Sequence, residues 1–153
     1  MALNRSKYNP RDSVERITIK NIDCLLKSYL ADKKEKGKNL LRDGCDFNIL
    51  HLKLGDVVRE YVDFLFEEYD VESARIHEFS PKQYAVPHFD SGYDGLDTFI
   101  VRIDKGKESR LKIEGILVPE HYGVGYKLPS GTLHEVILGK ETRYTLTVWG
   151  KSK

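Results

Sequence analysis

The sequence has little of several features, and each shortage excludes a class of protein. It contains only two cysteines, Cys24 and Cys45, which form neither a zinc-knuckle spacing nor a disulfide framework, so a reducing compartment is the simplest expectation. No apolar run approaches the roughly 20 residues of a membrane span. The first ten residues are polar and lack the apolar centre of a signal peptide. We therefore expect a cytoplasmic protein with no membrane partner.

The net charge is also small. The 153 residues include 25 basic and 24 acidic side chains, so the formal net charge is +1, which argues against a nucleic-acid partner. A hydrophobic content of 40% and a mean hydropathy of −0.48 are typical of a folded globular chain. No internal repeat or flexible linker divides the sequence. We expect a single domain over residues 1–153.

The first part of the chain has a largely helical pattern. Apolar residues recur at helical spacing between residues 22 and 30, and a longer apolar stripe runs over residues 57–69 with Asp56 as its N-cap. A short β-branched run at residues 14–19 predicts one strand. We expect residues 1–70 to be mainly helical, with two or three helices.

After residue 70 strands dominate the pattern. Short runs rich in Val, Ile, Tyr, Phe and Thr alternate with Gly, Pro, Asp and Ser. These runs lie at residues 72–79, 97–104, 110–117, 123–129, 133–138 and 142–149. Strands at this spacing are typical of a sandwich, a barrel or a jelly roll. The expected fold class is α+β, with a β core over residues 71–150 and the helices packed outside it.

Three residues form a candidate metal site. In an extended segment His88 and Asp90 point the same way, so both can reach one ion. His134 follows a glycine-containing turn and begins a strand. A lone His-x-Asp pair arises often by chance, but two histidines with one carboxylate make the set that non-haem Fe(II) enzymes use.

The last strand, residues 142–149, presents an unusual polar face. Alternation puts Arg143, Thr145, Thr147 and Trp149 on one side and the apolar residues on the other. An arginine with a threonine beside it is well suited to bind a carboxylate. Arg143 lies nine residues after His134, so both can reach one cavity.

These motifs resemble those of the Fe(II)/2-oxoglutarate-dependent oxygenases, and most closely the prolyl hydroxylase branch. The segments that carry the resemblance are Pro87-His-Phe-Asp90, Gly131-Thr-Leu-His-Glu-Val136 and Thr142-Arg-Tyr-Thr-Leu-Thr-Val-Trp149. The resemblance implies a double-stranded β-helix, or jelly-roll, core. It spans about residues 72–150.

The resemblance also implies roles for individual residues. His88, Asp90 and His134 would be the iron ligands, and Arg143 would pair with the distal carboxylate of 2-oxoglutarate, with Thr145 beside it. The cofactors would be Fe(II), 2-oxoglutarate as cosubstrate and O2, with ascorbate as a candidate further requirement. The reaction would hydroxylate a C–H bond and release succinate and CO2. The substrate would be a prolyl residue in a peptide or protein, or a small molecule such as a free amino acid.

Two positions depart from the family pattern. Many members have a tyrosine about nine residues before the first histidine, where this chain has Phe79. Tyr84 is closer to His88 and is a candidate replacement in cosubstrate binding. Arg102 stands where relatives often have a bulky aromatic residue, and it is a candidate second carboxylate or substrate contact, the alternative being an arginine that faces solvent.

Three other functions remain open at this point. A non-oxygenase metal enzyme of cupin type has the same kind of barrel, although its ligand set usually has a second histidine where this chain has Asp90. A jelly-roll binding module without catalysis is the second alternative, which Phe79 keeps open. Oxidation of nucleic acid is the third, and the near-zero net charge counts against it.

Overall fold

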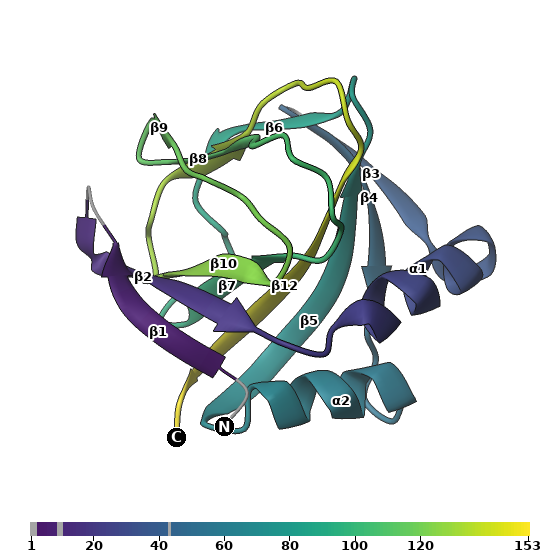
Figure 1. The fold of residues 1–153 in the computed structure, drawn as a ribbon, viewed down its shortest axis with the longest axis horizontal. Helices are drawn as coiled ribbons and strands as arrows, with labels where there is room; N and C mark the ends of the chain where they lie inside the picture. Colours follow the sequence, from purple (N-terminus) through teal and green to yellow (C-terminus); the bar gives the residue numbers. More distant parts are fainter. Residues whose placement is uncertain (1–2, 9–10, 43) are drawn as a thin grey trace.

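A computed structural model describes residues 3–8, 11–42 and 44–153 of the chain (Figure 1). The two helices are α1 (Asp23–Lys36) and α2 (Val57–Leu65). The strands are β1 (Leu3–Tyr8), β2 (Arg11–Ile19), β3 (Lys38–Arg42), β4 (Cys45–His51), β5 (Tyr69–Phe79), β6 (Tyr84–His88), β7 (Asp97–Arg102), β8 (Leu111–Ile113), β9 (Ile116–Leu117), β10 (Val124–Leu128), β11 (His134–Val136) and β12 (Arg143–Ser152). Neither described helix is long and apolar enough to cross a membrane.

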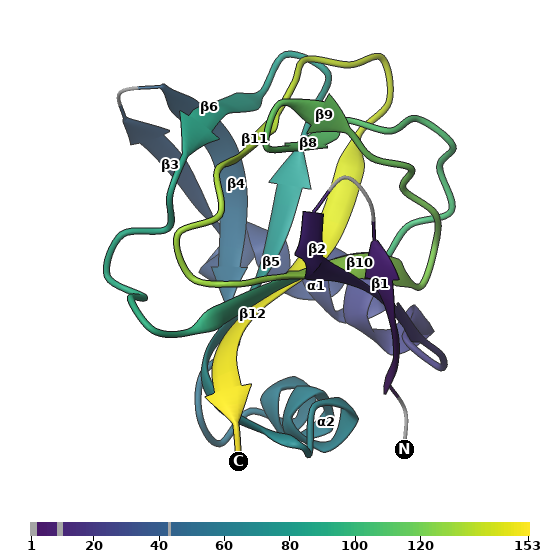
Figure 2. The ribbon, with the colours of Figure 1, turned by 90° about the vertical axis from the view of Figure 1, so that its left-hand side faces the viewer.

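The strands form one antiparallel sheet that winds around an interior (Figures 1 and 2). Along the sheet the order is β1-β2-β10-β7-β12-β5-β4-β6-β11-β8-β9, and β3 is paired with β4 alone. Neighbours in this order are often far apart in sequence, as in a jelly roll. Strands β12 and β5, of ten and eleven residues, pair with each other in the middle of the curved sheet.

The alternation of side chains along β12 divides the fold into an outside and an inside. Leu146 and Val148 belong to the core that lies between the sheet and the two helices. Arg143, Thr145 and Thr147 face the interior and line a cavity there. The expected division of this strand into an apolar and a polar face is therefore confirmed.

Two apolar clusters hold the fold together. The outer cluster joins β5, β7 and β12 to helices α1 and α2, with Leu25 and Val62 as fully buried helix residues. The inner cluster fills one end of the interior and includes Phe47, Phe79 and Leu111. Because the helices cover only the outer face, the interior remains lined by the sheet itself (Figure 1).

The structure confirms most of the expected strands and corrects the first part of the chain. Each run predicted after residue 70 contains a strand, and the run at 110–117 contains two short ones. The expectation that residues 1–70 are mainly helical is wrong, since the described residues of this part form four strands as well as two helices. Strand β3 has charged ends and lies at the edge of the sheet, and it is defined by its pairing with β4 rather than by its own composition.

The second helix is shorter than its apolar stripe. It ends at Leu65, and Tyr69 already begins β5, where it is paired with Ser152. The apolar residues after Leu65 are buried in the outer cluster without being helical, as Phe66 and Tyr69 are. The apolar residues at helical spacing therefore extend beyond the end of α2, through a turn and into β5.

The outer cluster predicts a large effect for truncation of β12. We expect Leu146→Ala, which empties space at a fully buried site, to lower the free energy of unfolding by about 2–5 kcal/mol. Leu41→Ala on the exposed side of β3 is the matched control, with an expected change below ~0.5 kcal/mol. Urea titration followed by circular dichroism measures both. Equal effects of the two substitutions would contradict the assignment of β12 to the core.

Candidate metal centre

Three side chains, two from neighbouring strands and one from the segment that follows β6, converge on one point. His88 ends β6 and His134 begins β11, and the antiparallel pairing of these strands sets the two residues opposite each other. The Nε2 atoms of His88 and His134 each lie 3.3 Å from Oδ1 of Asp90. The potential ligand atoms of the three residues all lie within 4.8 Å of one another. The imidazoles are therefore close enough to share one ion.

Backbone carbonyls orient both imidazoles. Nδ1 of His88 lies 2.8 Å from the carbonyl oxygen of Val86, and Nδ1 of His134 lies 2.9 Å from that of Thr132. A carbonyl oxygen only accepts hydrogen bonds, so each Nδ1 carries a proton, and Nε2 is the atom that offers a lone pair whenever the ring is neutral. This is the arrangement in which a histidine can bind a metal through Nε2.

Asp90 is held from its other side by two donors. Its Oδ2 accepts a hydrogen bond from Thr98 Oγ1 at 3.0 Å and one from Trp149 Nε1 at 3.1 Å. Burial alone would raise the pKa of Asp90, but hydrogen bonds from His134, His88 and Trp149 lower it well below its usual range. The carboxylate is therefore ionised and directs Oδ1 toward the two histidines.

The three residues lie in the wall of a cavity of about 330 Å³. Another part of the lining is formed by inward-facing side chains of β12 and β5, which we call the floor. The floor consists of Arg143, Thr145, Thr147, Trp149, Arg75, His77 and Phe79. Register pairs Arg143 with Phe79, Thr145 with His77 and Thr147 with Arg75, so these residues follow one another in rows along the cavity.

The floor carries polar atoms that have no partner within the described part of the chain. These buried atoms are Arg75 Nε, His77 Nε2 and Thr145 Oγ1. All three residues line the same cavity. Because an unsatisfied buried polar group costs about 1–3 kcal/mol, three of them in one cavity indicate that it is built for a polar ligand.

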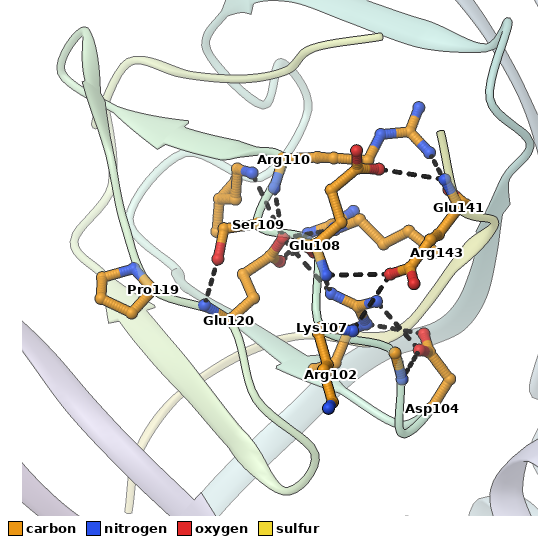
Figure 3. Close-up of polar contacts among 12 residues, drawn as sticks. Arg102, Asp104, Lys107, Glu108, Ser109, Arg110, Pro119, Glu120, Glu141 and Arg143 are labelled. Carbon is orange, nitrogen blue, oxygen red and sulfur yellow. Dashed lines mark hydrogen bonds and ion pairs between the residues drawn. The ribbon is translucent and has the colours of Figure 1, made fainter. Parts of the chain in front are cut away.

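One edge of the Arg143 guanidinium is already engaged (Figure 3). Its Nε lies 2.8 Å and 3.1 Å from the two carboxylate oxygens of Glu120, and Nη2 is 2.7 Å from Oε1, without the alignment of a hydrogen bond. The backbone N–H of Arg110 also donates to Glu120. Glu120 therefore fixes the position of the Arg143 guanidinium, which lies 5.5 Å from the centre of the Phe79 ring.

Arg102 is not in the cavity wall, contrary to its expected role as a second carboxylate or substrate contact. It is buried, so the alternative of an arginine that faces solvent is also wrong. Its Nε and Nη2 donate to Asp104 at 2.6 Å and 2.9 Å, and Nη1 donates to the carbonyl of Glu108 at 2.7 Å (Figure 3). The neighbouring carboxylate of Asp104 occupies the guanidinium and keeps it away from the cavity.

The other residues expected near the cosubstrate are divided. Tyr84 is 39% exposed on β6 and does not line the cavity, whereas its neighbour Ala85 does. Phe79 lines the cavity and stacks on Phe47, with 4.6 Å between the ring centres. The position where many family members have a tyrosine is therefore part of an apolar pair in this chain. Thr145 lies in the cavity wall, as expected.

Sequence reasoning missed Arg75, His77 and Glu120. The alternation along residues 72–79 puts Arg75 and His77 on the same face as Phe79, so a signal was present in the sequence. Glu120 had none, since it lies between strands and reaches Arg143 only in the folded chain. The sequence also gave no sign that the Trp149 indole donates to Asp90.

No protein-family model matches the sequence, and no curated protein matches it. Solved structures do match, and they define the fold class as that of 2-oxoglutarate–Fe(II) oxygenases, including prolyl hydroxylases. The resemblance read from the three sequence motifs is thereby confirmed at the level of the fold.

Three of these structures are prolyl hydroxylases. A Pseudomonas putida prolyl-4-hydroxylase has a TM-score of 0.71 at 15% identity, over 99% of this chain and 93% of its own. A prolyl hydroxylase from Trichoplax adhaerens, in complex with a hypoxia inducible factor peptide fragment, has a TM-score of 0.65 at 12% identity, over 99% and 84%. A viral collagen prolyl hydroxylase from Paramecium Bursaria Chlorella virus-1, in complex with 2-oxoglutarate, has a TM-score of 0.64 at 16% identity, over 92% and 97%.

The floor predicts an acid-sensitive stability that depends on His77. Burial first, and then the charges of Arg75 and Arg143, lower the pKa of His77 from 6.5 to about 3, while Asp90 opposes the shift and His51 adds to it. His77 therefore binds a proton near pH 6.5 in the unfolded chain, but only near pH 3 in the folded chain. The contribution to stability is complete above pH 6.5 and is lost as the pH falls, by up to ~1.4 kcal/mol per pH unit.

Urea unfolding of the metal-free protein at pH 7, 6 and 5 measures this slope. We expect His77→Gln to flatten it over that range, because the glutamine does not titrate. His121→Gln, at an exposed histidine, is the control and should leave the slope unchanged. An identical slope in wild type and His77→Gln would show that His77 is not the titrating group.

Proposed function

We propose that the chain is an Fe(II)- and 2-oxoglutarate-dependent dioxygenase that hydroxylates a C–H bond of a peptide, protein or small-molecule substrate. The observation that carries the proposal is the convergence of His88 and His134 on Asp90, with both Nε2 atoms 3.3 Å from one carboxylate oxygen. Two imidazoles and one carboxylate leave coordination positions open, which suits non-haem Fe(II). The similarity of the fold to prolyl hydroxylases, one of them bound to a peptide, supports the class of substrate.

The residues present fit an iron ion and an oxygen-rich cosubstrate. His88, Asp90 and His134 would hold the metal, because the carbonyl contacts of both Nδ1 atoms direct both Nε2 atoms toward Asp90. Arg143 and Thr145 would bind the distal carboxylate of 2-oxoglutarate, since both line the cavity and the buried Thr145 hydroxyl has no partner in the described part of the chain. When bound, iron and 2-oxoglutarate supply oxygen activation coupled to release of succinate and CO2.

The remaining contribution of the chain is orientation and exclusion of water. Thr98 and Trp149 hold Asp90 so that only Oδ1 is available to a ligand. Glu120 fixes the guanidinium of Arg143, which lines the cavity, so the charge is held in place before a ligand binds. The apolar wall formed by Phe47 and Phe79 lowers the polarity of the cavity around that contact.

The direct test of this function is an assay for succinate released from 2-oxoglutarate. It requires Fe(II) and O2, with and without ascorbate, and is screened across prolyl peptides, free amino acids and nucleotides. We expect iron-dependent succinate release with one class of peptide or amino acid. Activity with manganese or zinc but none with Fe(II) and 2-oxoglutarate would favour the cupin-type enzyme, and the absence of any turnover would favour a binding module.

Metal binding is expected to depend on His134. The chain has a single tryptophan, Trp149, whose indole touches Asp90, so its fluorescence reports metal binding. We expect Mn(II) to quench this fluorescence in a saturable way, and His134→Ala to weaken the binding by at least ~100-fold because one of three ligands is lost. His121→Ala, at an exposed histidine, is the matched control. Equal Mn(II) affinity in wild type and His134→Ala would remove the metal assignment.

Cosubstrate affinity is expected to depend on Arg143. Removing Arg143 alone would leave the buried Glu120 carboxylate without its partner, which destabilises a protein strongly. We therefore expect the pair Arg143→Gln and Glu120→Gln to fold and to raise the 2-oxoglutarate concentration for half-maximal succinate release by about 10- to 100-fold. Glu120→Gln alone is the control. An unchanged requirement in the double variant would mean that another group holds the cosubstrate.

A further inference from the structure

A second guanidinium lies on the cavity floor, away from Arg143. Arg75 is on β5, where its Cα is paired with that of Thr147, whereas Arg143 is paired with Phe79. Thr147 is four residues from Arg143 along β12, so the two arginines start about 13 Å apart along the floor. Each lines the cavity from its own end.

Arg75 differs in its partners from Arg143 and Arg102, the two buried arginines described above. Arg143 is paired with Glu120, and Arg102 is paired with Asp104. Arg75 donates from Nη2 to the hydroxyl of Tyr93 at 3.2 Å, and its buried Nε has no partner. Within the described residues no carboxylate forms an ion pair with it. The charge of Arg75 is therefore available to an anion in the cavity.

The surroundings of Arg75 are aromatic and close to the candidate metal ligands. The guanidinium carbon lies 5.1 Å from the centre of the Trp149 ring, and the Tyr93 ring stacks on Trp149 at 4.3 Å. The same indole donates to Asp90. The Trp149 indole therefore contacts both Arg75 and Asp90, and an anion bound by Arg75 would lie next to the candidate metal site.

One molecule of 2-oxoglutarate cannot satisfy both arginines. If it chelates the metal and reaches Arg143, both of its carboxylates are used. His77, in the row between the two arginines, adds no charge near neutral pH because burial and both guanidinium groups lower its pKa to about 3. Arg75 then remains the charged group on the floor without a counter-ion in the described part of the chain.

We propose that Arg75, together with Tyr93 and Trp149, binds a free carboxylate of the substrate, within a few bonds of the carbon that is hydroxylated. This inference rests on the proposed function. A guanidinium binds a carboxylate through two parallel hydrogen bonds, and the unpartnered Nε supplies one of them. The carboxylate can belong to a free amino acid or to the C-terminal residue of a peptide, and the chemistry of recognition is the same.

Binding to the loaded protein without turnover tests this site. Wild type is loaded with Mn(II) and 2-oxoglutarate under nitrogen, and the fluorescence of Trp149 is followed as ligands are added. The ligands are L-amino acids, their amides, and prolyl dipeptides with free or amidated C-termini. We expect every ligand that binds to carry a free carboxylate. Free amino acids and dipeptide acids distinguish the two sources of that group.

Variants at Arg75 assign the effect to this residue. We expect Arg75→Gln to weaken binding of the carboxylate ligands by about 10- to 100-fold, and Arg75→Lys to weaken it less because the charge is kept. Arg75 has no carboxylate partner, so its removal strands no buried charge, and melting temperature checks the fold. Arg16→Gln, at an arginine of β2 that does not line the cavity, is the matched control and should bind as wild type does.

The outcomes separate this inference from the proposed function. If Mn(II) and 2-oxoglutarate do not bind wild type, the proposed function fails first. If they bind wild type and Arg75→Gln equally, but amides bind as well as acids, or no carboxylate ligand binds, only the inference on Arg75 is overturned. Loss of 2-oxoglutarate itself in Arg75→Gln would show that Arg75 holds the cosubstrate, which also overturns the inference.

Discussion

The site depends on the hydrogen bonds that orient the carboxylate of Asp90. One of its oxygens is held by Thr98 and Trp149, and the other faces the Nε2 atoms of His88 and His134. Without the two donors behind it, the carboxylate could rotate and would meet the imidazoles in no fixed geometry. The partners come from β7 and β12, so the orientation of Asp90 is set by the sheet as a whole rather than by its own loop.

The two central strands give the cavity its chemical polarity. Along β12 and β5 the outward residues Ala74, Ile76, Leu146 and Val148 are apolar and belong to the outer cluster, while the inward residues include arginine, histidine and threonine. This division allows one pair of strands to stabilise the fold and to line the site. It also explains why charged side chains are tolerated in the interior, since Arg143 and Arg102 are each met by a carboxylate (Figure 3).

The sequence predicted the parts of the site that depend on local alternation. His88, Asp90, His134, Arg143 and Thr145 all line the cavity, because each lies on a strand or next to one whose period of two is readable. The sequence failed where a side chain chooses among partners that only the fold supplies. Arg102 is buried but is bound by Asp104, and Tyr84 is near His88 in sequence but points to solvent. Strands β3 and β4 were missed because pairing across the sheet, not composition, defines them.

The central claim is that His88, Asp90 and His134 hold one ion. A crystal structure of the protein with Mn(II) and 2-oxoglutarate, with the metal located by its anomalous scattering, tests it most directly. The account predicts one manganese ion bound by both Nε2 atoms and by Oδ1 of Asp90, with Oδ2 still bound to Trp149. A manganese ion bound elsewhere, or none in this cavity at saturating concentration, would contradict it.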